Sequence, residues 1–149
     1  MEVLIENRQS RHRLSEPTLQ RTATRILSAL GYPDALLSIL IVDDDEIAEL
    51  NRNYLNHTGP TNVISFPMQE GQFADITPGL LGDVVISADT AHREAVDAGM
   101  EMALRIDQLL IHGILHLVGY DHVHSEEEAA AMVGMDRAVR EMRALINAL

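Results

Sequence analysis

The sequence contains no cysteine, no lysine and no tryptophan, and only 3% of its residues are aromatic. Without cysteine there is no thiolate for a soft metal, so such a site must use histidine and carboxylate ligands. No apolar run reaches the roughly 20 residues that span a bilayer, and the first residues lack a secretory-signal pattern. These absences lead us to expect a cytoplasmic protein without a membrane-spanning segment.

The composition is strongly acidic, with a formal net charge of −12. The chain has 11 arginines and no lysine. A field of this sign repels nucleic acid at long range. The arginines gather near the two ends of the chain, at positions 8–25 and 137–143. They form either one basic patch or ordinary solvated faces and ion pairs, and the second interpretation is favoured.

Length and hydrophobic periodicity predict the fold. With 149 residues, 46% of them hydrophobic, the chain fits a single domain over residues 1–149. The patterns predict strands at residues 1–6, 36–42, 62–66 and 81–87, with helices at residues 16–30, 44–54, 90–98, 100–118 and 125–147 and a long loop at residues 68–79. This order predicts an α/β (α+β) fold, in which a single mixed sheet of about four strands packs with helices.

Four consecutive acidic residues, Asp43 to Glu46, follow the second predicted strand. Such a run suits either metal ligands or the first turn of a helix, whose free N–H groups attract anions. Ile47, Leu50 and Tyr54 then continue at helical spacing. This continuation favours the start of a helix over a metal site.

The strongest chemical signal is the segment His112-Gly-Ile-Leu-His116-Leu-Val-Gly119-Tyr-Asp-His122. Histidines four apart on a helix share one face and lie about 6 Å apart along the axis. Gly119 can end the helix and let the chain bring His122 back over that face. Three imidazole nitrogens with an open fourth position are the ligand set of a catalytic zinc ion on a central helix.

The spacing matches the metzincin protease signature, except that Gly113 stands where the general-base Glu is expected. Gly113 most simply allows the central helix to pack closely against the sheet. Asp83 and Asp121 are the nearest acidic candidates for a base, and Asp121 better suits a hydrogen bond to a ligand histidine. His124 could supply a fourth nitrogen and close the site as a structural one. Imidazole also accepts nickel and iron, so the sequence leaves the metal open.

These segments make the chain similar to the YbeY family, which comprises bacterial single-strand-specific metallo-endoribonucleases that act in ribosomal RNA maturation. Residues 112–122 match the family pattern HGxLHLxGYDH, while residues 60–67 (PTNVISFP) and 81–87 (LGDVVIS) match PTNVLSFP and LLGDIVIS. The resemblance implies an α/β fold and one zinc ion on His112, His116 and His122. It also implies hydrolysis of single-stranded rRNA at the 16S rRNA 3′ end, in the cytoplasm and without a nucleotide cofactor. The implied partners are ribosomal particles and a ribosomal protein.

One segment departs from the family pattern. The family usually carries Tyr-Arg-x-Lys-Asp just before the Pro-Thr segment, but here Leu55 stands where the arginine is expected and His57 replaces the lysine. A positive charge for the substrate strand is therefore missing. Arg52, and Arg105 two helical turns before the histidine pair, are candidates for phosphate contacts, with an exposed or ion-paired role as the alternative for each.

Two other function classes remain open. A zinc peptidase or amidase is favoured by the metzincin-like spacing and disfavoured by the absent Glu. A zinc-binding, ribosome-associated factor with little catalysis is favoured by the missing arginine and the acidic composition.

Overall fold

The computed structural model describes residues 2–29, 32, 34–67 and 80–117. Along the chain these residues form β1 (Glu2–Asn7), α1 (Glu16–Ala29), β2 (Leu36–Val42), α2 (Asp44–Leu55), β3 (Val63–Pro67), β4 (Leu80–Ser87), α3 (Ala88–Ala98) and α4 (Met102–Leu117). Every strand and helix predicted within this part of the chain is found. The predicted loop at 68–79 and the predicted last helix at 125–147 lie outside the described residues. None of the helices described here is long and apolar enough to cross a membrane.

The four strands form one mixed sheet in the order β1-β2-β4-β3, which confirms the predicted fold class. β1, β2 and β4 run parallel, and β3 pairs antiparallel with β4, with Ser65 opposite Val84. The register shifts where Leu36 pairs with Leu80 and Leu37 with Gly82, so Leu81 is an extra residue on β4. Beyond this bulge, successive β4 side chains alternate regularly between the two faces of the sheet.

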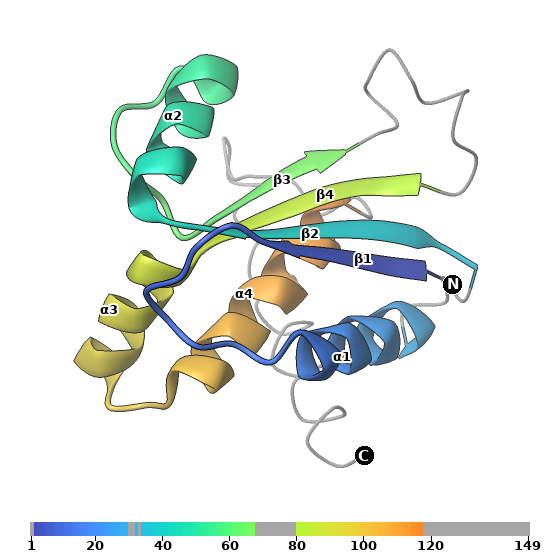
Figure 1. Cartoon of the computed structure of the whole chain (residues 1–149). Helices are drawn as coiled ribbons and strands as arrows, with labels where there is room; N and C mark the ends of the chain where they lie inside the picture. Colours follow the sequence, from blue (N-terminus) through green and yellow to red (C-terminus); the bar gives the residue numbers. More distant parts are fainter. Residues whose placement is uncertain (1, 30–31, 33, 68–79, 118–149) are drawn as a thin grey trace, which may run out of the picture.

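Helices cover both faces of the sheet, as Figure 1 shows: α1 and α4 lie on one face and α2 lies on the other. The larger core cluster fills the space beneath α1 and α4, and its strand members include Leu37, Ile39, Ile41, Val84 and Ile86. The smaller cluster lies beneath α2 and consists of Val42, Ile47, Ile64 and Val85. The second half of α4 is buried nearly all round, as its composition predicts, so it is the central helix of the larger core.

Side-chain caps explain where two of the helices begin. The Asp43 carboxylate accepts a hydrogen bond of 2.8 Å from the Glu46 backbone N–H and caps α2. The helix-start interpretation of the acidic run is therefore confirmed. Ser87 caps α3 in the same way through the Thr90 N–H, and α3 ends at Gly99, whose φ of 66° is left-handed.

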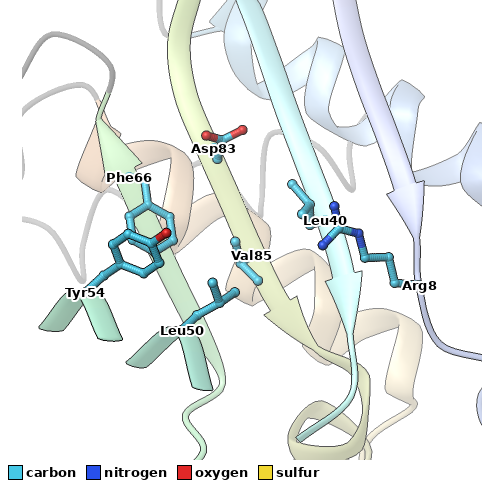
Figure 2. Close-up of a pocket in the computed structure, with 7 residues that line it drawn as sticks. All are labelled: Arg8, Leu40, Leu50, Tyr54, Phe66, Asp83 and Val85. Atoms are coloured by element: carbon cyan, nitrogen blue, oxygen red, sulfur yellow. The ribbon is translucent and has the colours of Figure 1, made fainter. Parts of the chain in front are cut away.

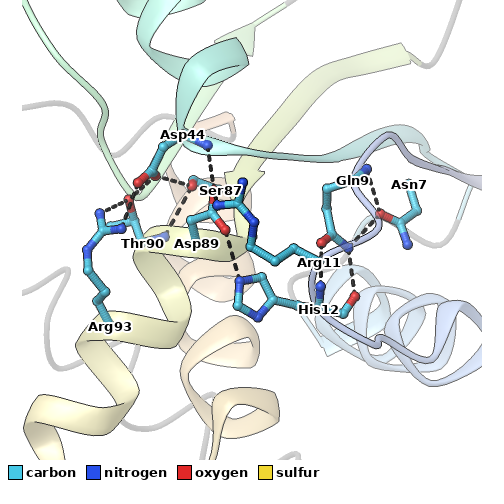
Figure 3. A network of polar contacts seen from close by, with 9 residues as sticks. All are labelled: Asn7, Gln9, Arg11, His12, Asp44, Ser87, Asp89, Thr90 and Arg93. Carbon is cyan, nitrogen blue, oxygen red and sulfur yellow. Dashed lines mark hydrogen bonds and ion pairs between the residues drawn. The ribbon is translucent and has the colours of Figure 1, made fainter.

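A buried carboxylate joins three parts of the chain that the sequence does not connect (Figure 3). Asp89 is only 6% exposed. Its two oxygens lie 2.9 Å from His12 Nε2 and 3.2 Å from an Arg11 guanidinium nitrogen, and the Asp44 backbone N–H donates to it at 3.0 Å. The Asp44 carboxylate in turn accepts hydrogen bonds from Ser87, Thr90 and Arg93. The network holds the segment after β1 against the N-terminal ends of α2 and α3.

The contacts of this network lower the pKa of both carboxyl groups. Burial alone would raise the pKa of Asp89, but the hydrogen bonds from the Asp44 N–H and His12, with the charge of Arg11, outweigh it and lower that pKa. Burial also opposes the ionised form of Asp44, and its three donors again outweigh it and lower its pKa. The stabilisation is thus fully present above the unfolded-state pKa of about 3.9 and is lost as the pH falls through the folded-state pKa.

We expect Asp89→Ala to lower the free energy of unfolding at pH 7 by about 2–4 kcal/mol, because it leaves buried donors without their acceptor. The deficit should begin to shrink below about pH 4, the unfolded-state pKa, and should be lost as the pH falls through the lowered pKa of Asp89 in the folded parent protein. Urea denaturation at pH 7 and at pH 3–4 measures both effects. Asp97→Ala, an exposed aspartate of the same helix, is the control and should stay within about 0.5 kcal/mol of the parent. A deficit for Asp89→Ala that does not change with pH would contradict the assignment.

Candidate metal centre

Helix α4 brings two of the predicted ligands into direct contact. His112 Nε2 and His116 Nε2 lie 2.9 Å apart, and the ring centroids are 4.6 Å apart with the planes tilted by 53°. The four-residue spacing places both rings on one face of the helix, as the sequence predicts. A bond between two ring nitrogens needs a proton on one of them and a lone pair on the other. The two nitrogens therefore already converge on one small region.

This pair fits a divalent metal ion. Two nitrogens bound tetrahedrally to zinc at about 2.0–2.1 Å stand about 3.3 Å apart, so the rings need to open by only a few tenths of an ångström. His122, the third predicted ligand, lies outside the described residues, as do Asp121 and His124. Among the residues that the structure does describe, no third His, Cys, Asp or Glu completes a group able to hold a metal. The roles proposed for His122, Asp121 and His124 at the metal therefore remain predictions.

Gly113 lies where α4 packs tightly against the sheet. A Cβ atom at this position would lie 2.7 Å from Val84 Cγ1, 3.2 Å from Val63 Cγ2 and 3.3 Å from Ser65 Oγ. The first distance is too short for two carbon atoms, so any residue larger than glycine would force the Val84 side chain or the backbone around it to shift. The prediction that Gly113 allows close packing of the central helix is confirmed. A Glu at this position would meet the same contacts, so this packing leaves no room at residue 113 for the general base of the metzincin signature.

A hydrogen bond that the sequence analysis missed crosses the same contact. The Ser65 hydroxyl donates to the backbone carbonyl of Gly113 at 2.8 Å. Val63 and Ser65 are two apart on β3, so strand alternation places them on one face, and that face meets α4. The alternation in the NVISF segment was the available signal, since Ser65 is the polar residue on an otherwise apolar face.

Asp83, a candidate base, lies on the other face of the sheet. It lines a pocket of about 320 Å³ together with Arg8, Leu40, Leu50, Tyr54, Phe66 and Val85 (Figure 2). Leu50 and Tyr54 belong to α2, whereas the next residue of β4, Val84, contacts α4. Successive strand residues point to opposite faces, so the structure does not bring Asp83 to His112 and His116. Nothing in the geometry therefore supports Asp83 as the group that moves a proton at these histidines.

The arginine candidates differ in their surroundings. The Arg105 guanidinium pairs with Glu94 at 3.1 Å and donates to Gln108 at 2.9 Å, so the ion-paired interpretation holds for it. Arg52 is exposed on α2. Leu55 ends that helix with 43% of its surface exposed, on the side of the sheet opposite α4 (Figure 1).

Two of the N-terminal arginines also form ion pairs with carboxylates of the same chain. Arg8 contacts both Glu6 and Glu46, at 3.1 and 2.7 Å, and these contacts raise its pKa further. Arg11 contacts Asp89. The favoured interpretation of these two residues as members of ion pairs is confirmed. The arginines at positions 137–143 lie outside the described residues.

Comparisons with known proteins identify the family of the chain and confirm its fold. A family model described as Endoribonuclease YbeY matches residues 4–143. Endoribonuclease YbeY of Geobacter metallireducens is 53% identical over 140 residues, which cover 93% of each chain. Endoribonuclease YbeY of Geobacter sulfurreducens is 51% identical over 147 residues, covering 99% of this chain and 97% of the relative. The solution structure of TM1509 from Thermotoga maritima has the same fold, with a TM-score of 0.62, 23% identity and coverage of 95% of this chain and 88% of that one.

We expect Gly113→Ala to destabilise the fold although alanine is the better helix former. The propensity gain is about 1 kcal/mol, and the overpacking against Val84 costs about 1–3 kcal/mol, so the net loss reaches about 2 kcal/mol. Denaturant unfolding of Gly113→Ala, Val84→Ala and the double variant tests the cause. The added methyl group fills the space that Val84→Ala vacates, so the double variant should be more stable than the sum of the single losses predicts, by about 1 kcal/mol or more. Strict additivity would show that the contact does not limit the packing.

Proposed function

Because this chain belongs to the YbeY family of endoribonucleases, we propose that it is a zinc-dependent hydrolase that cleaves single-stranded RNA at internal phosphodiester bonds. The observation that carries the proposal is the convergence of His112 Nε2 and His116 Nε2 at 2.9 Å on a helix fixed against the sheet. His122 supplies the third nitrogen of the proposed site. One ion is bound per chain, and a fourth position stays open for water.

When bound, zinc supplies hydroxide near neutral pH, since it lowers the pKa of its water to about 7, and it polarises a phosphoryl oxygen. The chain itself presents two imidazole lone pairs from α4, and Gly113, which has no side chain, lets this helix pack tightly against the sheet. Asp83 lies across the sheet, so it is the weaker candidate for moving a proton. We assign Asp121 instead to accept a hydrogen bond from a ligand histidine and fix its tautomer. In the absence of a motif Glu, the water's proton passes either to a substrate phosphate or to an acid from another part of the chain.

The proposed substrate is ribosomal RNA, and the proposed reaction is maturation of the 16S rRNA 3′ end in the cytoplasm. The family's endoribonuclease role and the similarity over nearly the whole chain support this proposal. The net charge of −12 gives no long-range attraction for RNA. We therefore propose that the RNA is presented within ribosomal particles, where a ribosomal protein partner holds the chain near its cleavage site.

We expect zinc-loaded protein to cleave an rRNA fragment with an unpaired segment, and to leave the same sequence intact when it is fully paired. His112→Ala and His116→Ala should each lower the rate by at least about 100-fold, because each removes a metal ligand. A chelator should abolish cleavage, and added zinc should restore it. Rates are followed by gel electrophoresis of end-labelled RNA.

The matched control is His92→Ala, which removes an exposed histidine of α3. It should cleave at the rate of the parent protein. Cleavage that persists in His112→Ala would mean that the ligand pair does not carry the activity. Protein that binds zinc but cleaves neither RNA would contradict the endoribonuclease proposal and favour the ribosome-associated factor.

We expect Leu55→Arg to tighten RNA binding, because it restores a positive charge where the family usually has one. One added phosphate contact should steepen the slope of log K against log salt by about 0.7 for a single strand. Leu4→Arg is the matched control, since Leu4 is exposed to a similar extent, 51% against 43%, but lies on β1 at the sheet edge opposite β3. Fluorescence anisotropy with a non-cleavable 2′-O-methyl RNA at several salt concentrations gives both slopes. Equal slopes for the two variants would show that position 55 is not on the RNA path.

A further inference from the structure

A polar contact connects the edge strand of the sheet to the helix segment that carries both proposed metal ligands. The hydroxyl of Ser65 on β3 donates to the carbonyl oxygen of Gly113 on α4 at 2.8 Å. Gly113 is adjacent to His112 and three residues before His116. The contact therefore joins the backbone of the turn from which both imidazole rings extend.

The geometry distinguishes this bond from the apolar packing around it. In an α-helix, the carbonyl at position 113 faces the N–H at position 117, which leaves its second lone pair for another donor. Val63 and Val84 touch the same point of the helix, but dispersion contacts are not directional and tolerate small rotations of the helix about its axis. A hydrogen bond restricts both distance and angle, so it opposes such rotation.

Small rotations matter because both ligands lie on one helical turn. Rotation of α4 moves the rings of His112 and His116 together relative to any third ligand that comes from another segment. Metal–nitrogen distances must hold to about 0.2 Å, and a functional site tolerates about 0.5 Å of misplacement. A bond that fixes the turn between the two histidines thus acts directly on the quality of the site.

We propose that Ser65 is a positioning residue for the metal site: its hydroxyl fixes the rotation of α4 so that His112 and His116 meet the ion in the geometry that a third ligand completes. The inference rests on the proposed function, because it presupposes that these histidines bind a metal. It adds a role for β3, which belongs to the edge of the sheet and supplies no ligand in the described part of the chain.

The test compares zinc affinity and cobalt spectra in variants that differ only in the hydroxyl. Ser65→Thr and Ser65→Val have nearly the same shape, and only threonine keeps the donor. Any strain from the added methyl group is common to both, so their difference reports the hydrogen bond alone. Ser65→Ala removes the donor without added volume. Ser38→Ala on β2 is the matched control, because Ser38 is also a half-buried strand serine but points to the face that α2 covers.

Zinc dissociation constants are measured by competition with a chromophoric chelator, on proteins shown by circular dichroism to be folded at the temperature used. We expect Ser65→Ala and Ser65→Val to bind zinc about 10-fold more weakly, as is typical when a group that orients a ligand is lost. Ser65→Thr and Ser38→Ala should stay within about 3-fold of the parent protein. Cobalt(II) is the second probe, since its visible spectrum reports ligand geometry. Its bands should change in the Val and Ala variants at position 65 and stay unchanged in the other two.

Three results have distinct meanings. Equal zinc affinities for the Thr and Val variants, with parent-like cobalt spectra, would overturn the inference even if both were less stable to heat, because Ser65 would then be purely structural. A parent protein that binds neither ion would contradict the metal-dependent function itself, and the inference with it. Loss of zinc affinity in Ser38→Ala equal to that in Ser65→Ala would also overturn the inference, since the effect would then be general to the sheet.

Discussion

The close approach of α4 to β3 and β4 at Gly113 is the constraint on which the rest of the site depends. The side chain of Val84 occupies the space where a Cβ of residue 113 would stand, and Val63 and Ser65 close the same contact from β3. A larger residue next to the first histidine would therefore have to displace these side chains, and the turn that carries His112 and His116 is held against β3 and β4. Ligands on a rigid, buried helix are placed more accurately than ligands on loops.

The two faces of the sheet have different chemistry, and the strand alternation decides which residue belongs to which face. Val84 contacts α4, while its neighbour Asp83 lines the pocket beneath α2 (Figure 2). Leu55, where the family has an arginine, also belongs to α2. The α4 face thus provides imidazole nitrogens in an apolar setting, and the α2 face provides aromatic, carboxylate and apolar groups. Any acid that assists the proposed metal must therefore come from the α4 side.

Local patterns sufficed for the elements and the ligand pair, but not for contacts between distant segments. Hydrophobic periodicity located the four strands and α4, and the acidic run from Asp43 to Glu46 predicted the start of α2. The pairing of Asp89 with His12 spans 77 residues of sequence and depends on how α3 meets the segment after β1, which no local rule specifies. Strand alternation places Asp83 and Val84 on opposite faces of β4, but which helix covers each face depends on the order of the strands in the sheet, which no local pattern specifies.

The distribution of charge bears on how an acidic protein can act on a polyanion. Four of the described arginines, Arg8, Arg11, Arg93 and Arg105, pair with acids of the same chain. These cations stabilise the fold and contribute little net attraction to phosphate, while the net charge of −12 opposes approach. A divalent ion at His112 and His116 would place two positive charges at the point of reaction, where they act at short range. If the proposed function holds, selection of the RNA strand would depend on contacts made close to the metal or on a partner that delivers the strand.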